Sequence, residues 1–275
     1  MSDMSKWGSL DSPLAAAVLQ RDRETINMVR EGLRRRNVFL AFQPVVQCQN
    51  STQPAFFEGL VRVRDGTNRV IPAHDFIYEI EPFEEGRIID CLALEMGCQA
   101  LIDHPNLRLS INISPRTIGL EQWDTVFESA TERDPTLAER LIIEITEASA
   151  MTMPDIVCDF MDKMNQKGVS FALDDFGAGY TAFRYFKDFY FDLVKIDGQF
   201  IRNIYADLDN QVLTAALVSI ARHFNMFVVA EGVEHPEEAN YLIGADVDCM
   251  QGFLLGAPQL RLPENTDSHF KAAKA

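Results

Sequence analysis

Acidic and amide side chains follow a series of short apolar segments in this chain, and together they could bind a cation. The strand-like segments end at or near Glu58, Asn112, Glu144, Asp174, Asp175, Asp197 and Glu231. Carboxylates gathered at strand ends repel one another unless a cation lies among them. Carboxylate oxygens with one amide oxygen are ligands that Mg²⁺ and Mn²⁺ prefer. The pattern therefore predicts a site for hard divalent cations.

The adjacent pair Asp174 and Asp175 is the sharpest local feature. Neighbouring side chains in a strand point to opposite faces. The segment Phe176–Gly179 that follows contains two glycines, so the backbone can turn there and direct both carboxylates at one site. The alternative is a helix N-cap, in which an Asp accepts hydrogen bonds from free amides.

Lys195 lies two residues before Asp197 in an apolar segment, so the two side chains share one face of the strand. Facing inward, Lys195 would be a buried cation that orients a water molecule or stabilises developing negative charge. Facing outward, it would be an ordinary solvated lysine. Its apolar neighbours favour the inward orientation.

The elements that must position these residues alternate along the chain. We expect strands at 39–46, 56–63, 107–114, 141–146, 169–175, 193–197, 227–232 and 247–255. We expect helices at 13–36, 86–103, 121–131, 154–167, 181–188, 208–224 and 236–243. This alternation predicts an α/β fold, a (β/α)₈ barrel of the TIM type, with chemistry at the C-terminal strand ends.

The first strand should depart from the regular pattern. Residues 47–55 include Asn50, Ser51 and Pro54 and read as a loop, which is too short for the crossover that a parallel pair requires. We therefore expect a modified barrel whose first strand is antiparallel. A doubly wound open sheet ranks lower, because no Gly-rich fingerprint follows the first strand.

Composition limits the function and the location. The net charge of −16 argues against DNA or RNA as a partner, since nucleic-acid binding needs a basic surface. No apolar run approaches the length of a membrane span, so we expect no membrane partner and a cytoplasmic location. The five cysteines contain no CxxC pair, and reduced, buried thiols are expected. We divide the chain into an N-terminal extension with a helix (1–28), one catalytic domain (29–262) and a flexible C-terminal tail (263–275).

Taken in order, these segments resemble the EAL-domain cyclic di-GMP phosphodiesterases over about residues 30–260. The segments that carry the resemblance are Glu58–Arg62, Asn112–Pro115, Glu144–Glu147, Asp174–Tyr180, Lys195–Asp197, Glu231–Glu234 and Gln251–Phe253. The chain departs from the family pattern at Gly59, in the segment Phe76–Glu81 and at Ala257, but at no residue that corresponds to a metal ligand.

The resemblance implies a role for each matching residue. It assigns one metal ion to Glu58, Asn112, Glu144 and Asp174, and a second to Asp174, Asp175 and Glu231. It assigns catalysis to Lys195, Glu231 and Gln251, with Lys195 contacting the attacking water. It assigns substrate binding to Gln43, Leu60, Arg62 and Asp197. It makes Glu147 the anchor of the loop that carries Phe176–Tyr180, with a plain helix N-cap as the alternative.

The activity that the resemblance implies is hydrolysis of cyclic di-GMP to linear pGpG with two Mg²⁺ or Mn²⁺ ions, with Ca²⁺ inhibitory, in a homodimer. The main alternative is a catalytically weak or inactive receptor for cyclic di-GMP, or a protein-interaction module. An unrelated metal-dependent barrel enzyme is the third reading.

Overall fold

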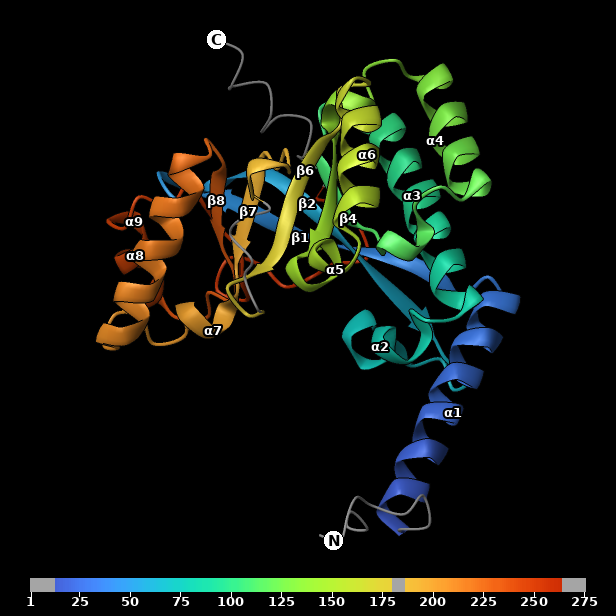
Figure 1. Cartoon of the computed structure of the whole chain (residues 1–275). Coiled ribbons are helices and arrows are strands. Elements are labelled where there is room, and N and C mark those ends of the chain that lie inside the picture. Colours follow the sequence, from blue (N-terminus) through green and yellow to red (C-terminus); the bar gives the residue numbers. More distant parts are fainter. Residues whose placement is uncertain (1–12, 180–185, 264–275) are drawn as a thin grey trace, which may run out of the picture.

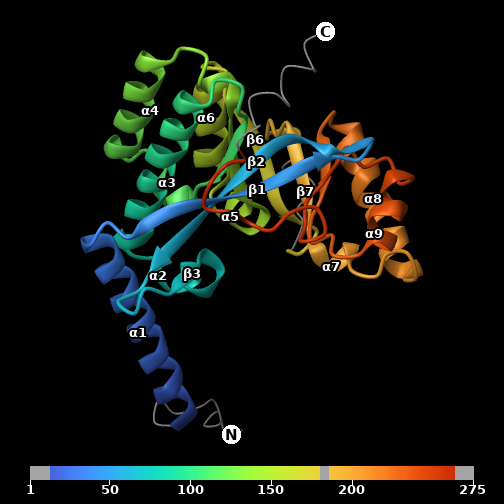
Figure 2. The same ribbon diagram turned by 180° about the vertical axis from the view of Figure 1, so that it is seen from behind.

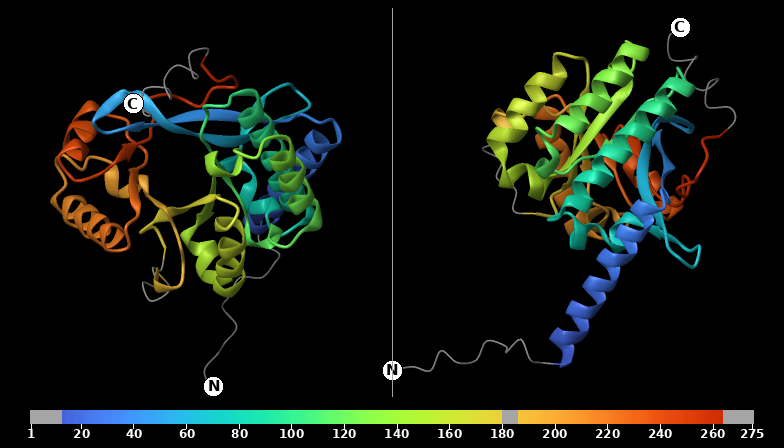
Figure 3. Two further views of the ribbon diagram at one scale, coloured as in Figure 1. Left: turned by 90° about the horizontal axis from the view of Figure 1, so that it is seen from above. Right: turned by 90° about the vertical axis from the view of Figure 1, so that its right-hand side faces the viewer.

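The strands of this chain close into a ring with helices on its outside, as the view from above shows (Figure 3). The computed structural model describes residues 13–179 and 186–263. The strands are β1 Val38–Gln47, β2 Asn50–Arg64, β3 Val70–Pro72, β4 Leu109–Asn112, β5 Leu141–Thr146, β6 Ser170–Phe176, β7 Leu193–Ile196, β8 Phe227–Ala230 and β9 Cys249–Met250. The sheet order is β1-β9-β8-β7-β6-β5-β4-β2-β3, and β1 also pairs with β2. The predicted barrel is confirmed, and the open doubly wound sheet is wrong.

The first strand is antiparallel to both of its neighbours, β2 and β9, whereas the pairs from β2–β4 through β8–β9 are parallel. The predicted loop at 47–55 is wrong, because β2 begins at Asn50, directly after a turn at residues 48 and 49. Pro54 lies in β2 where the β1–β2 register shifts. A bulge tolerates proline, which cannot donate to a regular ladder.

Helices follow the strands and cover the outer face of the ring (Figures 1 and 2). They are α1 Pro13–Arg34, α2 Ile77–Ile80, α3 Glu84–Asp103, α4 Glu121–Arg133, α5 Glu147–Thr152, α6 Pro154–Asn165, α7 Gly198–Ile201, α8 Leu208–His223 and α9 Pro236–Ile243. The 3₁₀ turns include Pro115–Thr117 after β4. Among the described residues, no helix combines the length and apolar character that crossing a membrane requires.

Helix ends match their sequence signals. Pro154 and Pro236 open α6 and α9, where the missing N–H costs nothing. Gly168 has a φ of 96° in the turn between α6 and β6, a conformation that favours glycine. The predicted strand at 247–255 is shorter, because after β9 the chain turns and Gly256 N donates to Gly252 O. The predicted helix at 181–188 falls largely on residues 180–185, which lie outside the described residues, as does the predicted tail from residue 264.

Helix α1 runs away from the barrel toward the N-terminus (Figures 1 and 3). Near its C-terminal end, Val29 is fully buried in an apolar cluster with Ile80 of α2 and Ile89 of α3. Arg30 of the same helix pairs with Glu85 at the start of α3, at 2.5 Å. The boundary that we predicted after residue 28 falls inside α1, so this helix both extends from the barrel and packs on it.

Candidate metal centre

The predicted polar residues lie on the inner face of the barrel near the C-terminal strand ends. The register of the strands sets their height along the barrel axis, since Asn112 pairs with Glu144, and Thr146 pairs with Asp174. On the antiparallel side, Gln43 of β1 lies directly opposite Glu58 of β2. The ring closure therefore brings side chains from both ends of the sequence to one place.

An apolar layer lies directly beneath this polar layer. Phe56, Ile142, Ala172 and Val229 form one buried cluster with Val45 and Cys249. Several of its members come two residues before a polar residue of the same strand, as Phe56 precedes Glu58 and Ile142 precedes Glu144. Alternate residues of a strand share a face, so the sequence pattern apolar-x-polar builds a water-excluding floor under a polar site.

Lys195 occupies the middle of the polar layer and is 1% exposed. Its Nζ lies 2.7 Å from Glu231 Oε1, 2.8 Å from Glu144 Oε2, 3.1 Å from Asp174 Oδ1 and 3.2 Å from Glu58 Oε2. The inward orientation predicted for this lysine is thus the one in the structure. A single ammonium bridges carboxylates from β2, β5, β6 and the end of β8.

Amide side chains complete the surroundings of Glu58. Gln251 Nε2 donates to Glu58 Oε2 at 2.6 Å and lies 3.2 Å from Gln43 Oε1. Asn112 Nδ2 donates to Glu58 Oε1 at 3.2 Å. Gln43 Nε2 donates to the carbonyl of Gly256 at 3.1 Å. These bonds hold Glu58 in one orientation in the interior.

The backbone of β6 explains how two adjacent aspartates serve one site. Asp175 has a φ of 57°, and the β6–β7 register shifts between Leu173 and Phe176. Asp and Asn tolerate this left-handed conformation better than most residues. Oxygen atoms of Asp174, Asp175 and Glu231 come within 4.8 Å of one another. Both aspartates lie within β6, so the N-cap interpretation is wrong there.

The charges of this cluster are not balanced. Burial, Glu58 and Asp174 raise the pKa of Glu144 to about 8 against the opposing effect of Lys195. Burial and the neighbours Asp174 and Asp197 raise the pKa of Asp175 to about 6. Burial and like charges also raise the pKa values of Asp174 and Glu231. One ammonium therefore does not suffice to keep all of these carboxylates ionised.

The pKa shifts of Glu58 and Lys195 both favour the charged form of the side chain. Burial pushes the pKa of Glu58 upward, but Lys195 and the bonds from Gln251 and Asn112 outweigh burial and lower it. Burial likewise opposes the charge on Lys195, yet the surrounding carboxylates hold its pKa well above the ordinary value. Lys195 therefore pairs as a cation with these carboxylates and donates hydrogen bonds to Glu58 and Glu144.

The residues present fit divalent metal ions. The donor set consists of carboxylates and amide oxygens, which suit Mg²⁺ and Mn²⁺. Two buried oxygens, Glu144 Oε1 and Gln251 Oε1, accept no hydrogen bond. The side chains of Asp174 and Glu231 are 14% and 20% exposed, whereas that of Glu144 is fully buried. A cation can therefore reach the cluster from the side of Asp174 and Glu231.

Glu147 lies outside the cluster but forms a hydrogen bond with the loop that follows Asp174 and Asp175. Its side chain is 1% exposed, and its Oε2 accepts a hydrogen bond from Gly177 N at 2.9 Å. Thr146, and not Glu147, is the N-cap of α5 and accepts from Ser149 N. The N-cap alternative for Glu147 is wrong, and its contact reaches the loop that begins two residues after Asp175.

Three of the predicted substrate residues lie on β2 and at the start of α7, and they differ in burial and in hydrogen bonding. Leu60 and Arg62 follow Glu58 on the same face of β2 and are half-buried. Burial lowers the pKa of Arg62, against the opposing charges of Glu58 and Asp75. Asp197 is the N-cap of α7 and accepts from Gln199 N at 2.7 Å.

Sequence reasoning missed two buried carboxylates near the site. Asp90 on α3 accepts from Ser114 N and Thr117 Oγ1, just after β4. Glu238 on α9 accepts from the amides of Asn203, Glu234 and His235. Asp90 interrupts an apolar stretch at 88–94, and that interruption was the available signal.

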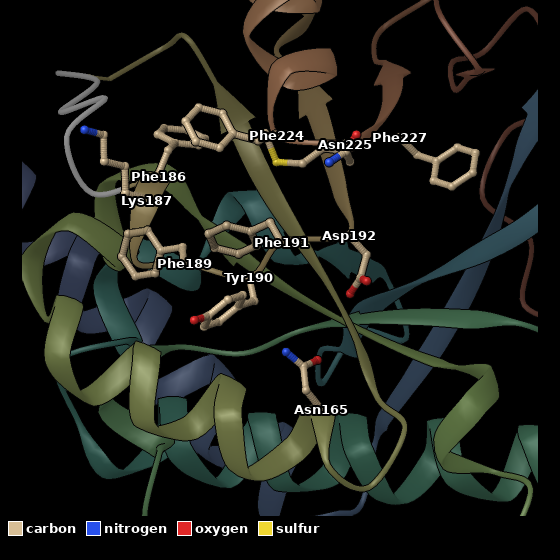
Figure 4. Close-up of a pocket in the computed structure, with 11 residues that line it drawn as sticks. Asn165, Phe186, Lys187, Phe189, Tyr190, Phe191, Asp192, Phe224, Asn225 and Phe227 are labelled. Carbon is tan, nitrogen blue, oxygen red and sulfur yellow. The ribbon is translucent and has the colours of Figure 1, made fainter.

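A cavity of about 610 Å³ lies away from this cluster, beside the segments that lead into β7 and β8 (Figure 4). Phe191, Tyr190 and Phe227 line it with Asn165 and Asp192. Asp192 Oδ2 already accepts a hydrogen bond from Phe171 N at 2.8 Å. These segments precede their strands, so the cavity lies at the N-terminal end of the barrel strands. Barrel enzymes place their chemistry at the other, C-terminal end, and residues at the N-terminal end usually contribute to stability.

Comparison with known proteins agrees with this geometry. The family model described as "EAL domain" matches residues 26–258. The chain is 29% identical over 252 residues to the cyclic di-GMP phosphodiesterase PdeF of Escherichia coli K12, and the match covers 89% of this chain and 33% of PdeF. It is 28% identical over 246 residues to MucR of Pseudomonas aeruginosa, named as a bifunctional diguanylate cyclase and cyclic di-GMP phosphodiesterase. That match covers 87% of this chain and 36% of MucR. The chain spans about a third of the length of these relatives.

Solved structures show the same fold. The "PaMucR Phosphodiesterase, c-di-GMP complex" superposes with a TM-score of 0.78 at 27% identity, over 86% of this chain and 97% of that one. An EAL domain protein from Listeria monocytogenes EGD-e superposes with a TM-score of 0.74 at 27% identity, over 86% and 94% of the two chains.

Proposed function

This chain belongs to the EAL domain family, and we propose that it is a phosphodiesterase that hydrolyses cyclic di-GMP to linear pGpG with two divalent cations. Its relative PdeF is named as a cyclic di-GMP phosphodiesterase, and the MucR structure is named as a complex with c-di-GMP. The single observation that carries the proposal is the polar layer, in which carboxylates from three strands and from the residue after β8 converge on one buried lysine.

The proposal divides the metal ligands between two positions. Glu58, Asn112, Glu144 and Asp174 would hold one ion, and Asp174, Asp175 and Glu231 would hold the second. The second group is supported by the mutual approach of its oxygen atoms within 4.8 Å. Two Mg²⁺ or Mn²⁺ ions held there would offset the charge of the phosphodiester and lower the pKa of a water molecule, so that it could lose a proton to solvent and attack as hydroxide.

The remaining residues would bind and orient the reactants. Lys195 is a buried cation among the carboxylates, so it would donate a hydrogen bond to the attacking oxygen. Gln251, which donates to the same oxygen of Glu58 as Lys195 does, would help to orient the attacking oxygen. Glu231 lies beside the lysine at the exposed side of the cluster. We assign Gln43, Leu60, Arg62 and Asp197 to the dinucleotide, and Arg62 supplies a cation for its phosphate.

Product analysis tests the proposal directly. Purified protein is incubated with cyclic di-GMP and Mg²⁺ or Mn²⁺, and the products are separated by chromatography. We expect pGpG from the wild type, none from the Glu58→Ala variant, and wild-type turnover from Glu132→Gln, which changes an exposed carboxylate on α4. Binding of cyclic di-GMP without pGpG would identify a receptor, and turnover by folded Glu58→Ala would overturn the metal assignment.

The proposal also includes the location and the assembly of the protein. The five cysteines are free thiols, four of them buried, which suits a reducing compartment such as the cytoplasm. Leu208, Val212 and Leu213 on α8 are exposed apolar side chains, and we assign them to the contact between two copies of this chain.

A further inference from the structure

We propose that Asp90, a buried carboxylate outside the metal centre, is a positioning residue that sets the orientation of Asn112 and thereby the affinity of one metal position. The inference rests on the proposed function for the role of Asn112 as a ligand. The side chain of Asp90 accepts hydrogen bonds from Ser114 and Thr117, which we assign to neither the metal ions nor the substrate.

The geometry places Asp90 against the backbone that follows Asn112. Its Oδ2 accepts a hydrogen bond from Ser114 N at 3.0 Å and another from Thr117 Oγ1 at 2.5 Å. Ser114 comes two residues after Asn112, and Thr117 ends the 3₁₀ turn Pro115–Thr117. One carboxylate oxygen on α3 therefore holds both ends of the turn that leaves β4.

A second carboxylate reaches the same serine. Ser114 Oγ donates to Glu81 Oε1 at 2.8 Å, where Glu81 follows α2. On the opposite side, the amide of Ile113 donates to the carbonyl of Glu144 at 3.0 Å. The backbone just after Asn112 is thus held from α3, from the end of α2 and from β5. With this backbone held, the Asn112 side chain keeps its bond to Glu58 and presents its amide to the cluster.

The free-energy cost of burying the Asp90 carboxylate indicates that this residue does more than fill space in the packing. The residue is 8% exposed and lies between Ile89 and Cys91 in α3. Burial raises the pKa of Asp90 to about 7, against the hydrogen bonds from Thr117 and Ser114. A carboxylate is costly to bury even when it is hydrogen-bonded, if it must also carry a charge, whereas an apolar residue would satisfy the packing of this helix face at no such cost. Residues that hydrogen-bond directly to metal ligands typically change metal affinity 10- to 100-fold when they are replaced, and Asp90 acts one step further back, through the backbone after Asn112.

The test measures metal binding directly, so that it does not depend on turnover. Mn²⁺ is titrated into the full chain, and free Mn²⁺ is quantified by electron paramagnetic resonance. The variants are Asp90→Ala, Asp90→Asn and Thr117→Val. The matched control is Asp103→Asn, the same change at an exposed position of the same helix. Thermal unfolding followed by circular dichroism shows that each variant is folded at the assay temperature.

We expect Asp90→Ala to weaken one Mn²⁺ position by about 10-fold, the lower end of the range for direct partners of metal ligands, and Asp103→Asn to leave both unchanged. Asp90→Asn keeps an acceptor for Ser114 N and should recover part of the loss, and Thr117→Val should lose less than Asp90→Ala. If Asp90→Ala fails to fold, the Asp90→Asn and Thr117→Val variants decide. Folded variants with wild-type Mn²⁺ affinity would overturn the inference. A wild type that binds Mn²⁺ but leaves cyclic di-GMP intact would instead overturn the proposed function alone.

Discussion

At the scale of single residues, Lys195 has the most unusual surroundings in the described part of the chain. It is buried, and four carboxylate oxygens lie within 3.2 Å of its Nζ. A buried ion pair is often no better for stability than an apolar residue of similar size, but removal of one partner is costly. Lys195 therefore has two separable effects, one on the charge balance of the cluster and one on the reaction.

We predict that Lys195→Ala lowers the maximal rate of cyclic di-GMP hydrolysis about 10²- to 10³-fold, as loss of one charge-stabilising contact typically does. Substrate affinity should change much less, because the contact strengthens in the transition state. Calorimetry with Ca²⁺ in place of Mg²⁺ measures binding, and a product assay with Mg²⁺ measures the rate. A variant that loses binding but keeps its maximal rate would make Lys195 a substrate-binding residue.

Asp90 gives a pH-dependent contribution to stability that can be worked out in sign. Its pKa is about 7 in the folded protein, raised by burial from an ordinary value of 3.8. Between these values the folded state holds a proton that the unfolded state has lost, so the free energy of unfolding falls as pH rises. The facing groups are Glu81 and Cys91, and burial raises the pKa of the Cys91 thiol to about 11. That thiol therefore stays neutral in this range.

In the wild type, Asp90 should lower the free energy of unfolding by at most about 1.4 kcal/mol per pH unit between about pH 4 and its folded pKa near 7. We predict that this contribution is absent from Asp90→Asn. Urea unfolding of wild type and Asp90→Asn at a series of pH values measures the difference, in which the other carboxylates cancel. Above the folded pKa the two curves should run parallel. Parallel curves throughout would show that Asp90 does not titrate in this range.

At the scale of secondary-structure elements, the turn after β6 decides whether Asp175 can join the cluster. Asp175 has a φ of 57° and Gly177 a φ of 92°. A side chain added at Gly177 would also come within 2.8 Å of Phe200, so both the conformation and the space require glycine. Glu147, at the start of α5, holds this turn through the amide of Gly177. One hydrogen bond therefore couples β6 and its turn to α5, the helix that follows the neighbouring strand β5.

We predict that Glu147→Ala lowers metal affinity and turnover by about 10- to 100-fold and costs about 1 kcal/mol of stability, because the partly buried amide of Gly177 loses its partner. Glu147→Gln retains an acceptor and should lose less of each. Mn²⁺ titration and thermal unfolding provide the measurements, with Glu132→Ala on α4 as the control. Equal losses in the Ala and Gln variants would show that the hydrogen bond from Gly177 is not the cause.

At the scale of the whole molecule, the unbalanced negative charge of the cluster should make folding stability depend on divalent cations. Ligands that bind only the folded state stabilise it by about 2.7 kcal/mol at 100 times their Kd. We predict that Mg²⁺, Mn²⁺ and Ca²⁺ each raise the melting temperature of the wild type, and raise that of Glu58→Ala less. Ca²⁺ should nevertheless not support efficient turnover, since it prefers longer bonds and a looser geometry. An unchanged melting temperature with all three ions would contradict a metal centre.

The exposed apolar side chains of α8 give a prediction about assembly. Leu208 and Val212 are 73% and 69% exposed and lie one turn apart, so they cover the same stripe of the helix. We predict that the wild type is a dimer by light scattering after gel filtration and that Val212→Asp is a monomer. Phe227→Asp, which changes a residue that is 61% exposed elsewhere, should remain a dimer. A monomeric wild type would refute the assignment of this surface.

Much of the site could be predicted from the sequence because barrel strands use alternation. A polar residue two positions after an apolar one, at the end of a short strand, indicates an inward side chain above the barrel floor. That rule predicts Glu58, Glu144 and Glu231 without tertiary information. The short connection between the first two strands likewise required an antiparallel pair, and the order of the motifs indicated the family. Apart from the order of the motifs, these features are local, so the residues that encode them lie close together in the chain.

Only the tertiary structure decided which of these groups meet. Gln251 contacts Gln43 and Glu58 across 208 and 193 residues of sequence, a contact set by ring closure and strand register. The direction of Asp175 depends on a φ of 57° and a register shift beside β7. The bond from Ser114 to Asp90 depends on how α3 packs behind β4. Local sequence determines which way a side chain faces along its strand, whereas the closure of the barrel and the packing of its helices determine what that side chain touches.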